Sequence, residues 1–418
     1  MSQSPFPPIS VNGRNYQLPN QPIVVICLDG SADEYFNCAM ARGQMPHLTR
    51  ISIEGYRGLA RAAMPTFTNV NNSSIVTGVA PSVHGIGGNF FLDTETGEEV
   101  MMNSARFLRV PTIFPACQRA GRRVGVVTAK EKLRDIFANG LIEVGGIAFS
   151  AERAKSATRD THGIEAVENL VGTTPEIYSG DASLYVLKAG VAMLKNGLAD
   201  FLYLSTTDYM QHKYAPEHPN SLDFYAGIDI EIGNLLAAGA LIGITADHGM
   251  NAKQKPDGSP NVIYLESELA DVFGSGIRVI LPITDPYVAH HGALGSFAQV
   301  HLPPGLDLAK VRDWLLQREG VVECHERSTA ARLMELPEDR MGDLVVAAGR
   351  DIVLGRTAAD HDLSALAGAL RSHGGRYEEM VPLFFSHRLT TEYTARVAGD
   401  VRNFDIFQIT CNGLIASV

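Results

Sequence analysis

Four short, continuous apolar segments constrain the fold of this chain more than any other feature. Each is rich in Val, Ile, Leu or aromatic residues and does not alternate with polar ones, as expected of strands buried on both faces of a parallel sheet. The segments are residues 23–28, 124–128, 201–205 and 241–245. Helical patterns separate them, for example over residues 183–195. This alternation predicts a doubly wound α/β sheet.

Polar or charged residues follow each segment where the strand is expected to end. Asp29 follows the first segment and Lys130 the second. Asp208 follows the third, and Asp247-His248 the fourth. In open α/β sheets, ligands bind in the crevice outside the carboxyl ends of the strands. Four such coincidences in one chain are hard to explain by packing, so we expect a functional site at this edge.

Asp208 and His212 are four residues apart, so a helical turn after the third strand would place both on one face. A carboxylate and an imidazole are both good zinc ligands. Taken alone, however, the pair is more typical of a helix N-cap and a surface histidine.

The pair Asp247-His248 gives stronger support for a metal site because it directly follows a buried strand. Gly249 permits the sharp turn that would direct both side chains inward. The alternative is an ordinary hydrogen-bonded loop. Asp29 adds a carboxylate after the first strand, although aspartate at such a position also often caps a helix.

Thr68 lies in the segment Met64-Pro65-Thr66-Phe67-Thr68-Asn69. Pro65 disfavours helix before it, and Thr68 stands where a helix would begin. A hydroxyl group there lies beside free backbone N–H groups, which suit a phosphoryl oxygen. A bound metal ion can activate such a hydroxyl as a nucleophile. The alternative is a simple N-cap threonine, and spacing alone does not decide between the two.

Together these motifs resemble the alkaline phosphatase superfamily, in its phosphodiesterase and phosphonoacetate hydrolase branch. The resemblance covers residues 23–128, 201–250 and 372–385. The matching motifs are Asp29-Gly30, Pro65-Thr66-Phe67-Thr68, Asp208-x-x-x-His212, Asp247-His248-Gly249-Met250, and Ser372-His373-Gly374 before Val381-Pro382-Leu383. The fold it implies is an alkaline phosphatase-like three-layer α/β core with a mainly parallel sheet and a small inserted α/β cap.

The resemblance also implies two Zn²⁺ ions and a catalytic threonine. One metal site would comprise Asp29, Thr68, Asp247 and His248. The other would comprise Asp208, His212 and His373. Mn²⁺ or Fe²⁺ could also occupy N/O sites of this kind.

The nucleophile and the substrate contacts distinguish the branches of the superfamily. Other branches use serine, or a modified cysteine in a CxPxR motif that this sequence lacks, whereas Thr68 resembles the phosphodiesterase and phosphonoacetate hydrolase branch. Asn89, Lys130, Lys132 and His212 resemble substrate-binding positions of that branch. We expect the two lysines to converge from an irregular loop on a substrate carboxylate, although a lysine pair of this spacing is more often simply solvated.

The function implied is zinc-dependent hydrolysis of the C–P bond of phosphonoacetate to acetate and phosphate, through a phosphothreonine intermediate. The resemblance thus implies a metal-dependent hydrolase of phosphonate degradation, with a small-molecule phosphonate as substrate. A nucleotide pyrophosphatase/phosphodiesterase is the main alternative. A non-catalytic protein that keeps the fold is disfavoured because every motif position is filled.

Composition limits the other possibilities. The net charge is −11 and the sequence has no basic stripe, so nucleic-acid binding is not expected. Five scattered cysteines without a CxxC motif indicate a reducing compartment. Residues 1–22 lack the pattern of a signal peptide, and no apolar run is long enough to cross a membrane. We therefore expect a cytoplasmic protein; a homodimer is considered for its assembly.

The domain organisation follows from a change of pattern near residue 262. Residues 1–262 and 365–418 are predicted to form the metal-binding catalytic core, and residues 263–364 a cap subdomain. Within the cap, strands are expected over residues 296–302, 320–324 and 343–348, and a helix over 308–317. His290 and His291 could line the site, with a packing or surface role about equally compatible with the sequence.

Overall fold

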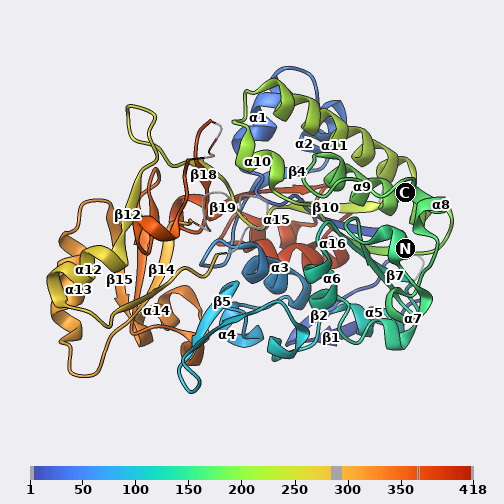
Figure 1. Cartoon of the computed structure of the whole chain (residues 1–418). Helices are drawn as coiled ribbons and strands as arrows, with labels where there is room; N and C mark the ends of the chain where they lie inside the picture. The colour runs from blue at the N-terminus through green and yellow to red at the C-terminus, as the bar shows by residue number, and fades with distance from the viewer. Residues whose placement is uncertain (1–3, 284–293, 365, 367, 416–418) are drawn as a thin grey trace.

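The computed structural model describes residues 4–283, 294–364, 366 and 368–415. Its largest element is a seven-stranded sheet with the order β4-β19-β10-β3-β9-β7-β8 (Figure 1). The strands from β10 to β8 pair in parallel, whereas β19 runs antiparallel to both of its neighbours. In sheet order they are β4 (Tyr56–Arg61), β19 (Met380–Phe385), β10 (Leu241–Thr245), β3 (Ile23–Cys27), β9 (Phe201–Ser205), β7 (Val124–Thr128) and β8 (Ile147–Ser150).

The four predicted apolar segments are the four adjacent strands β10, β3, β9 and β7. Every residue of these strands is buried, as the continuous apolar patterns predicted. The prediction of an α/β fold with a mainly parallel sheet is confirmed. Because the four strands are neighbours, the polar residues that follow them are delivered to one edge of the sheet.

Helices cover both faces of this sheet and form two separate cores. Alternate residues of β3 point to opposite faces: Val24 and Ile26 enter one core, and Ile23, Val25 and Cys27 enter the other. The first face packs against α1 (Asp33–Ala41), α2 (Pro46–Glu54), α9 (Asp181–Lys195) and α11 (Pro219–Ala237). The second packs against α3 (Thr68–Thr77), α5 (Phe114–Arg119), α6 (Glu131–Phe137), α15 (Thr391–Val397) and α16 (Ile406–Asn412).

A second sheet lies beside the first, on the left of Figure 1, with the order β13-β14-β16-β15. Its pairs are antiparallel and it has a hydrophobic core of its own. The strands are β13 (Arg278–Ile280), β14 (Phe297–His301), β16 (Leu344–Ala348) and β15 (Val321–Glu326), with helices α12 (Leu265–Phe273), α13 (Leu308–Gln317) and α14 (Arg327–Met334). The three strands and the helix expected in this region are therefore present. The boundaries 263–364 for a cap stay a prediction.

Short elements complete the chain, and several of them surround the edge of the large sheet. Strand β11 (Asn251–Ala252) pairs with β18 (Arg371–Ser372), and β12 (Val262–Tyr264) pairs with β17 (Val353–Gly355). Two hairpins consist of β1 (Ile9–Val11) with β2 (Arg14–Tyr16), and β5 (Phe90–Asp93) with β6 (Glu98–Met101). The short helices are α4 (Pro81–His84), α7 (Arg159–His162), α8 (Val167–Val171) and α10 (Tyr209–Lys213).

Candidate active site

The carboxyl ends of three adjacent strands bring carboxylates and imidazoles together. Asp29 follows β3, Asp208 follows β9, and Asp247 and His248 follow β10. The last residues of these strands are in register, so the side chains that follow them lie at the same level. All four are buried, with at most 1% of their surface exposed. Such a concentration of buried charge requires compensation.

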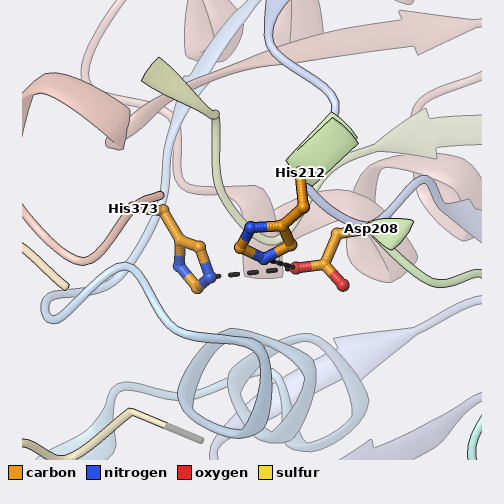
Figure 2. A group of neighbouring side chains, drawn as sticks. All are labelled: Asp208, His212 and His373. Carbon is orange, nitrogen blue, oxygen red and sulfur yellow. Dashed lines mark ion pairs between the residues drawn. The ribbon is translucent and has the colours of Figure 1, made fainter. Parts of the chain in front are cut away.

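Asp208, His212 and His373 form a first group of potential metal ligands (Figure 2). The Nε2 atom of His212 lies 3.0 Å from Asp208 Oδ2, and that of His373 lies 3.8 Å from it. The Nδ1 atoms donate to backbone carbonyls, that of His212 to Arg371 at 2.8 Å and that of His373 to Thr66 at 2.7 Å. These bonds fix both rings with Nε2 directed inward, as is usual for metal-binding histidines.

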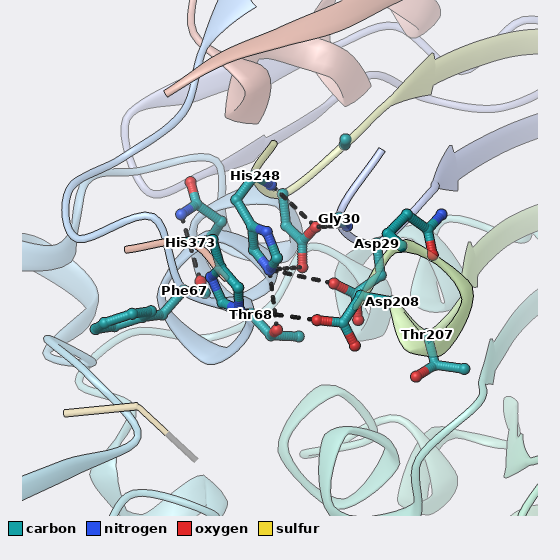
Figure 3. Close-up of polar contacts among 12 residues, drawn as sticks. Asp29, Gly30, Phe67, Thr68, Thr207, Asp208, His248 and His373 are labelled. Carbon is teal, nitrogen blue, oxygen red and sulfur yellow. Dashed lines mark hydrogen bonds and ion pairs between the residues drawn. The ribbon is translucent and has the colours of Figure 1, made fainter. Parts of the chain in front are cut away.

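Asp29, Asp208 and His248 form a second group, which shares Asp208 with the first. His248 Nε2 lies 3.3 Å from Asp29 Oδ1 and 3.3 Å from the hydroxyl oxygen of Thr68 (Figure 3). The Nδ1 atom of His248 donates to the carbonyl of Gly249 at 2.9 Å. The Thr68 hydroxyl is therefore in contact with one of the two groups of ligand atoms.

Asp247 lies beside these groups but belongs to neither of them among the residues described. Its Oδ1 accepts hydrogen bonds from the backbone N–H groups of Gly30 and His248. Its Oδ2 accepts one from Asn72 at 2.9 Å and lies 3.8 Å from His248 Nε2. The role of Asp247 as a metal ligand stays a prediction.

The two central carboxylates have opposite electrostatic environments. Burial, together with the nearby carboxylates of Asp208 and Asp247, raises the pKa of Asp29 well above its usual range. Burial also acts to raise the pKa of Asp208, but Lys130 and His212 outweigh it and hold that pKa well below the usual range. Lys130 Nζ lies 3.4 Å from Asp208 Oδ1.

The pKa values of the two stacked histidines, His248 and His373, are also shifted in opposite directions. Their rings lie 3.6 Å apart between centroids, with a 6° angle between planes. Burial acts to lower the pKa of His248, but the carboxylates of Asp247 and Asp29 outweigh it and raise this pKa to about 9. Burial and the neighbouring His248 and His212 lower the pKa of His373 well below its usual range.

These residues fit a divalent metal ion. Neither carboxylate oxygen of the completely buried Asp29 has a hydrogen-bond partner among the described residues, although His248 Nε2 lies 3.3 Å from Oδ1. One imidazole does not balance three neighbouring buried carboxylates, and a bound cation would supply the further positive charge. The donors are carboxylate oxygens and imidazole nitrogens, a set that suits Zn²⁺ and other first-row ions.

Thr68 is the first residue of α3, as predicted, and its side chain is 7% exposed. The preceding Phe67 is extended, so the first N–H groups of the helix have no partner within it. Such a turn favours a negatively charged oxygen. All ten residues of α3 are buried, which is unusual for a sequence as polar as TNVNNSSIVT.

Asn72 explains part of this polarity and was missed by the sequence reasoning. Its amide donates to Asp247 Oδ2 at 2.9 Å and to the carbonyl of Thr68 at 3.1 Å. Its Oδ1 accepts from the hydroxyls of Tyr203 at 2.6 Å and Ser205 at 2.8 Å. The amide thus connects the first turn of α3, at Thr68, to a site carboxylate and to β9. Its only signal in the sequence is its position, four residues after the threonine.

The two lysines occupy different positions. Lys130 is buried and is the N-cap of α6. Lys132 is half-buried and lies within the first turn of that helix. The expectation of an irregular loop is therefore wrong for Lys132, because the helix begins at residue 131. Lys130 forms the ion pair with Asp208.

Asn89 is buried and lies one residue before β5. Its carbonyl accepts from the N–H of Met102, and the carbonyl of Met102 accepts from the side chain of Asn69 at 2.9 Å. Asn69 directly follows Thr68, so this chain of bonds connects Asn89 to the first turn of α3.

His290 and His291 lie outside the described residues. In the part of the chain that is described, no helix is long and apolar enough to cross a membrane.

Comparisons with known proteins identify the family. The type I phosphodiesterase / nucleotide pyrophosphatase family matches residues 23–375. Phosphonoacetate hydrolase from Sinorhizobium meliloti 1021, crystallised with phosphonoacetate and with phosphonoformate, is 46% identical to this chain. The match covers 97% of this chain and 98% of that one, with a TM-score of 0.93. Murine ectonucleotide pyrophosphatase / phosphodiesterase 5 shares the fold at 17% identity and a TM-score of 0.62, over 95% of this chain and 96% of that one. These findings confirm the resemblance to the alkaline phosphatase superfamily. The chain is a hydrolase that belongs to the type I phosphodiesterase / nucleotide pyrophosphatase family.

Proposed function

We propose that this protein hydrolyses the C–P bond of phosphonoacetate to acetate and phosphate, with Thr68 as the nucleophile. The observation that carries the proposal is the similarity to the S. meliloti phosphonoacetate hydrolase, an enzyme that has been crystallised with phosphonoacetate. This similarity extends over 97% of this chain. The arrangement of a threonine hydroxyl beside two groups of ligand atoms gives it a chemical basis.

The proposal includes two Zn²⁺ ions. Asp208, His212 and His373 would hold one ion. Asp29, Asp247 and His248, with Thr68, would hold the other. When bound, such ions neutralise the charge of the phosphonate and lower the pKa of the threonine hydroxyl.

Thr68 performs the first chemical step. Its oxygen attacks phosphorus, an O–P bond forms, and the C–P bond breaks with its electron pair remaining on carbon. Carbon then accepts a proton, and acetate leaves. Water attacks the phosphothreonine, releases phosphate and restores the hydroxyl. The sum of these steps is phosphonoacetate plus water giving acetate plus phosphate.

The developing negative charge on the acetate group needs stabilisation, and Lys130 and Lys132 are the proposed source. A fixed cation in a site shielded from water stabilises a transition state more than one in bulk solvent. Lys130 is buried beside Asp208, so its ammonium group is held at the carboxyl edge of the sheet. Asn89 and His212 are proposed as contacts to the phosphonate oxygens.

The domain assignment is also part of the proposal. Residues 1–262 and 365–418 would form the catalytic core, and residues 263–364 a cap. The separate hydrophobic core of the second sheet supports this division.

A nucleotide pyrophosphatase/phosphodiesterase remains the second candidate, because the family that matches residues 23–375 carries that description. It would use the same threonine but would need a binding surface for a nucleotide base.

A paired assay separates the two functions. The zinc-loaded protein is incubated with phosphonoacetate while free phosphate is followed, and in parallel with a nucleotide diester. We expect phosphate from phosphonoacetate and negligible cleavage of the diester. Cleavage of the diester alone would refute C–P hydrolysis and assign the protein to the phosphodiesterases.

A further inference from the structure

A fully buried ion pair joins the two chain segments that follow the stacked histidines of the site in the sequence. Lys253 Nζ is 2.8 Å from Glu378 Oε1, and neither side chain has any solvent exposure. Lys253 follows β11, and Glu378 ends the short helix at Arg376–Glu378. Burying two charges carries a large desolvation penalty, and an apolar pair of similar size is often as stable or more stable. Stability alone therefore does not account for this pair.

The carboxylate of Glu378 joins two segments of the chain. Its Oε1 accepts from Lys253 and from the side chain of Asn251 at 2.6 Å. Its Oε2 accepts from the backbone N–H of Gly375 at 3.0 Å. The backbone carbonyl of Glu378 accepts from Gly249 at 2.8 Å. Glu378 thus binds the segment 249–253, and it also binds Gly375, three residues before it in the sequence.

Each of these segments carries a histidine of the site. His248 directly precedes Gly249, and His373 lies two residues before Gly375. The two imidazoles come from segments far apart in the sequence, yet their rings are stacked at 3.6 Å. Strands β11 and β18 contribute two residue pairs to this junction, and the N–H of Lys253 and the side chain of Asn251 donate to the carbonyls of Leu370 and Tyr377. The Glu378 carboxylate supplies three further bonds.

We propose that Glu378 and Lys253 form a positioning pair, which fixes His248 and His373 relative to one another and thereby the two groups of metal ligands. This inference rests on the proposed function, since it concerns the affinity of the same metal ions. Neither residue is among the proposed metal ligands or substrate contacts. Lys253 pairs with Glu378 and is itself anchored by a bond from Nζ to the carbonyl of Arg350 at 2.7 Å.

The test is a zinc titration of wild-type protein and three variants, with a competing chromophoric chelator and unfolding curves of the metal-free proteins. In Glu378→Gln the shape is kept, but Lys253 loses its counter-charge. In the double variant Lys253→Met/Glu378→Gln no unpaired charge is buried, so the fold is retained. The matched control is Asp200→Asn. It breaks the ion pair with the buried Arg122 at the opposite edge of the same sheet, where β7 and β9 begin.

The expected result is a zinc affinity at least about tenfold weaker in both Glu378 variants, the size of effect typical of partners that orient metal ligands. Asp200→Asn is expected to unfold more easily than wild type while keeping wild-type zinc affinity. The positioning role would be overturned if the folded Glu378→Gln variant bound zinc with wild-type affinity. If that variant does not fold, the double variant serves for the same comparison. Either result would leave the proposed metal site standing. Failure of the wild-type protein to bind zinc would instead refute the proposed metal site and this inference with it.

Discussion

Replacing Asn72 with alanine is expected to lower both the stability of the protein and its affinity for zinc. The amide is completely buried and makes four hydrogen bonds. Its loss removes the donor to Asp247 Oδ2 and the acceptor of the Tyr203 and Ser205 hydroxyl groups. A buried polar atom that loses its partner costs about 1–3 kcal/mol, so three such atoms give a loss of about 3–9 kcal/mol, less whatever a water molecule in the new space recovers.

The expected loss of zinc affinity in this variant follows from the contact between Asn72 and Asp247. Asn72 is the side chain that holds its Oδ2 atom, at 2.9 Å. Loss of a partner that orients a ligand typically weakens metal binding by about 10- to 100-fold. Denaturant unfolding of the metal-free protein measures the first effect, and a zinc competition titration of the folded protein measures the second.

Asn71→Ala is the matched control, since the neighbouring amide is equally buried. It exchanges hydrogen bonds with the backbone of Ala63 and accepts one from Asn403, and within the described part of the chain it makes no hydrogen bond to a site carboxylate. We expect a similar loss of stability and unchanged zinc affinity. The reasoning is refuted if Asn72→Ala binds zinc as tightly as wild type, or if Asn71→Ala weakens zinc binding to the same degree.

Four further predictions follow from the site. Thr68→Ala should abolish phosphate release from phosphonoacetate while equilibrium dialysis still finds bound zinc; full turnover would contradict its role. Lys130→Met should lower kcat/KM for phosphonoacetate in steady-state assays and raise the pKa of Asp208, because burial then acts without the cation; unchanged kinetics would exclude a role for the lysine. Chelation should lower the thermal midpoint and added zinc should restore it, since Asp29 lies buried among carboxylates; an unchanged midpoint would argue against the metal site. His248 has a raised folded pKa of about 9, so its protonation stabilises the metal-free protein fully below the unfolded pKa of about 6.5, and this stabilisation is lost as pH rises through 9. Denaturant curves over this window should show the slope in wild type and a smaller one in His248→Gln.

Much of the fold is predictable because buried parallel strands have a distinctive local pattern. The predicted bounds of β7, β9 and β10 agree with the structure, and β3 ends one residue earlier than expected. β19 was not predicted as a strand. It contains Pro382, which removes a backbone donor, and it is antiparallel to both neighbours. β4 is only partly buried, so its sequence lacks a continuous apolar run.

The candidate site also contains some residues that the sequence predicts and others that it does not. Residues that directly follow strands, such as Asp29 and Asp208, are predictable from the topology of an α/β sheet. The residues that support them are not, because their partners are distant in the sequence. Asn72 contacts Tyr203 and Asp247 across 131 and 175 positions. Glu378 contacts Lys253 across 125. The sequence around each of these residues does not indicate which distant residue it contacts.

The proposed reaction requires Thr68 to carry the phosphoryl group during C–P bond cleavage. The most direct measurement is mass spectrometry of peptides from zinc-loaded protein that has been acid-quenched during turnover of phosphonoacetate. We expect one phosphoryl group on the peptide that contains Thr68, with its formation rate no slower than phosphate release. Phosphate release with no phosphorylated Thr68 under these conditions, together with undiminished turnover by Thr68→Ala, would contradict it.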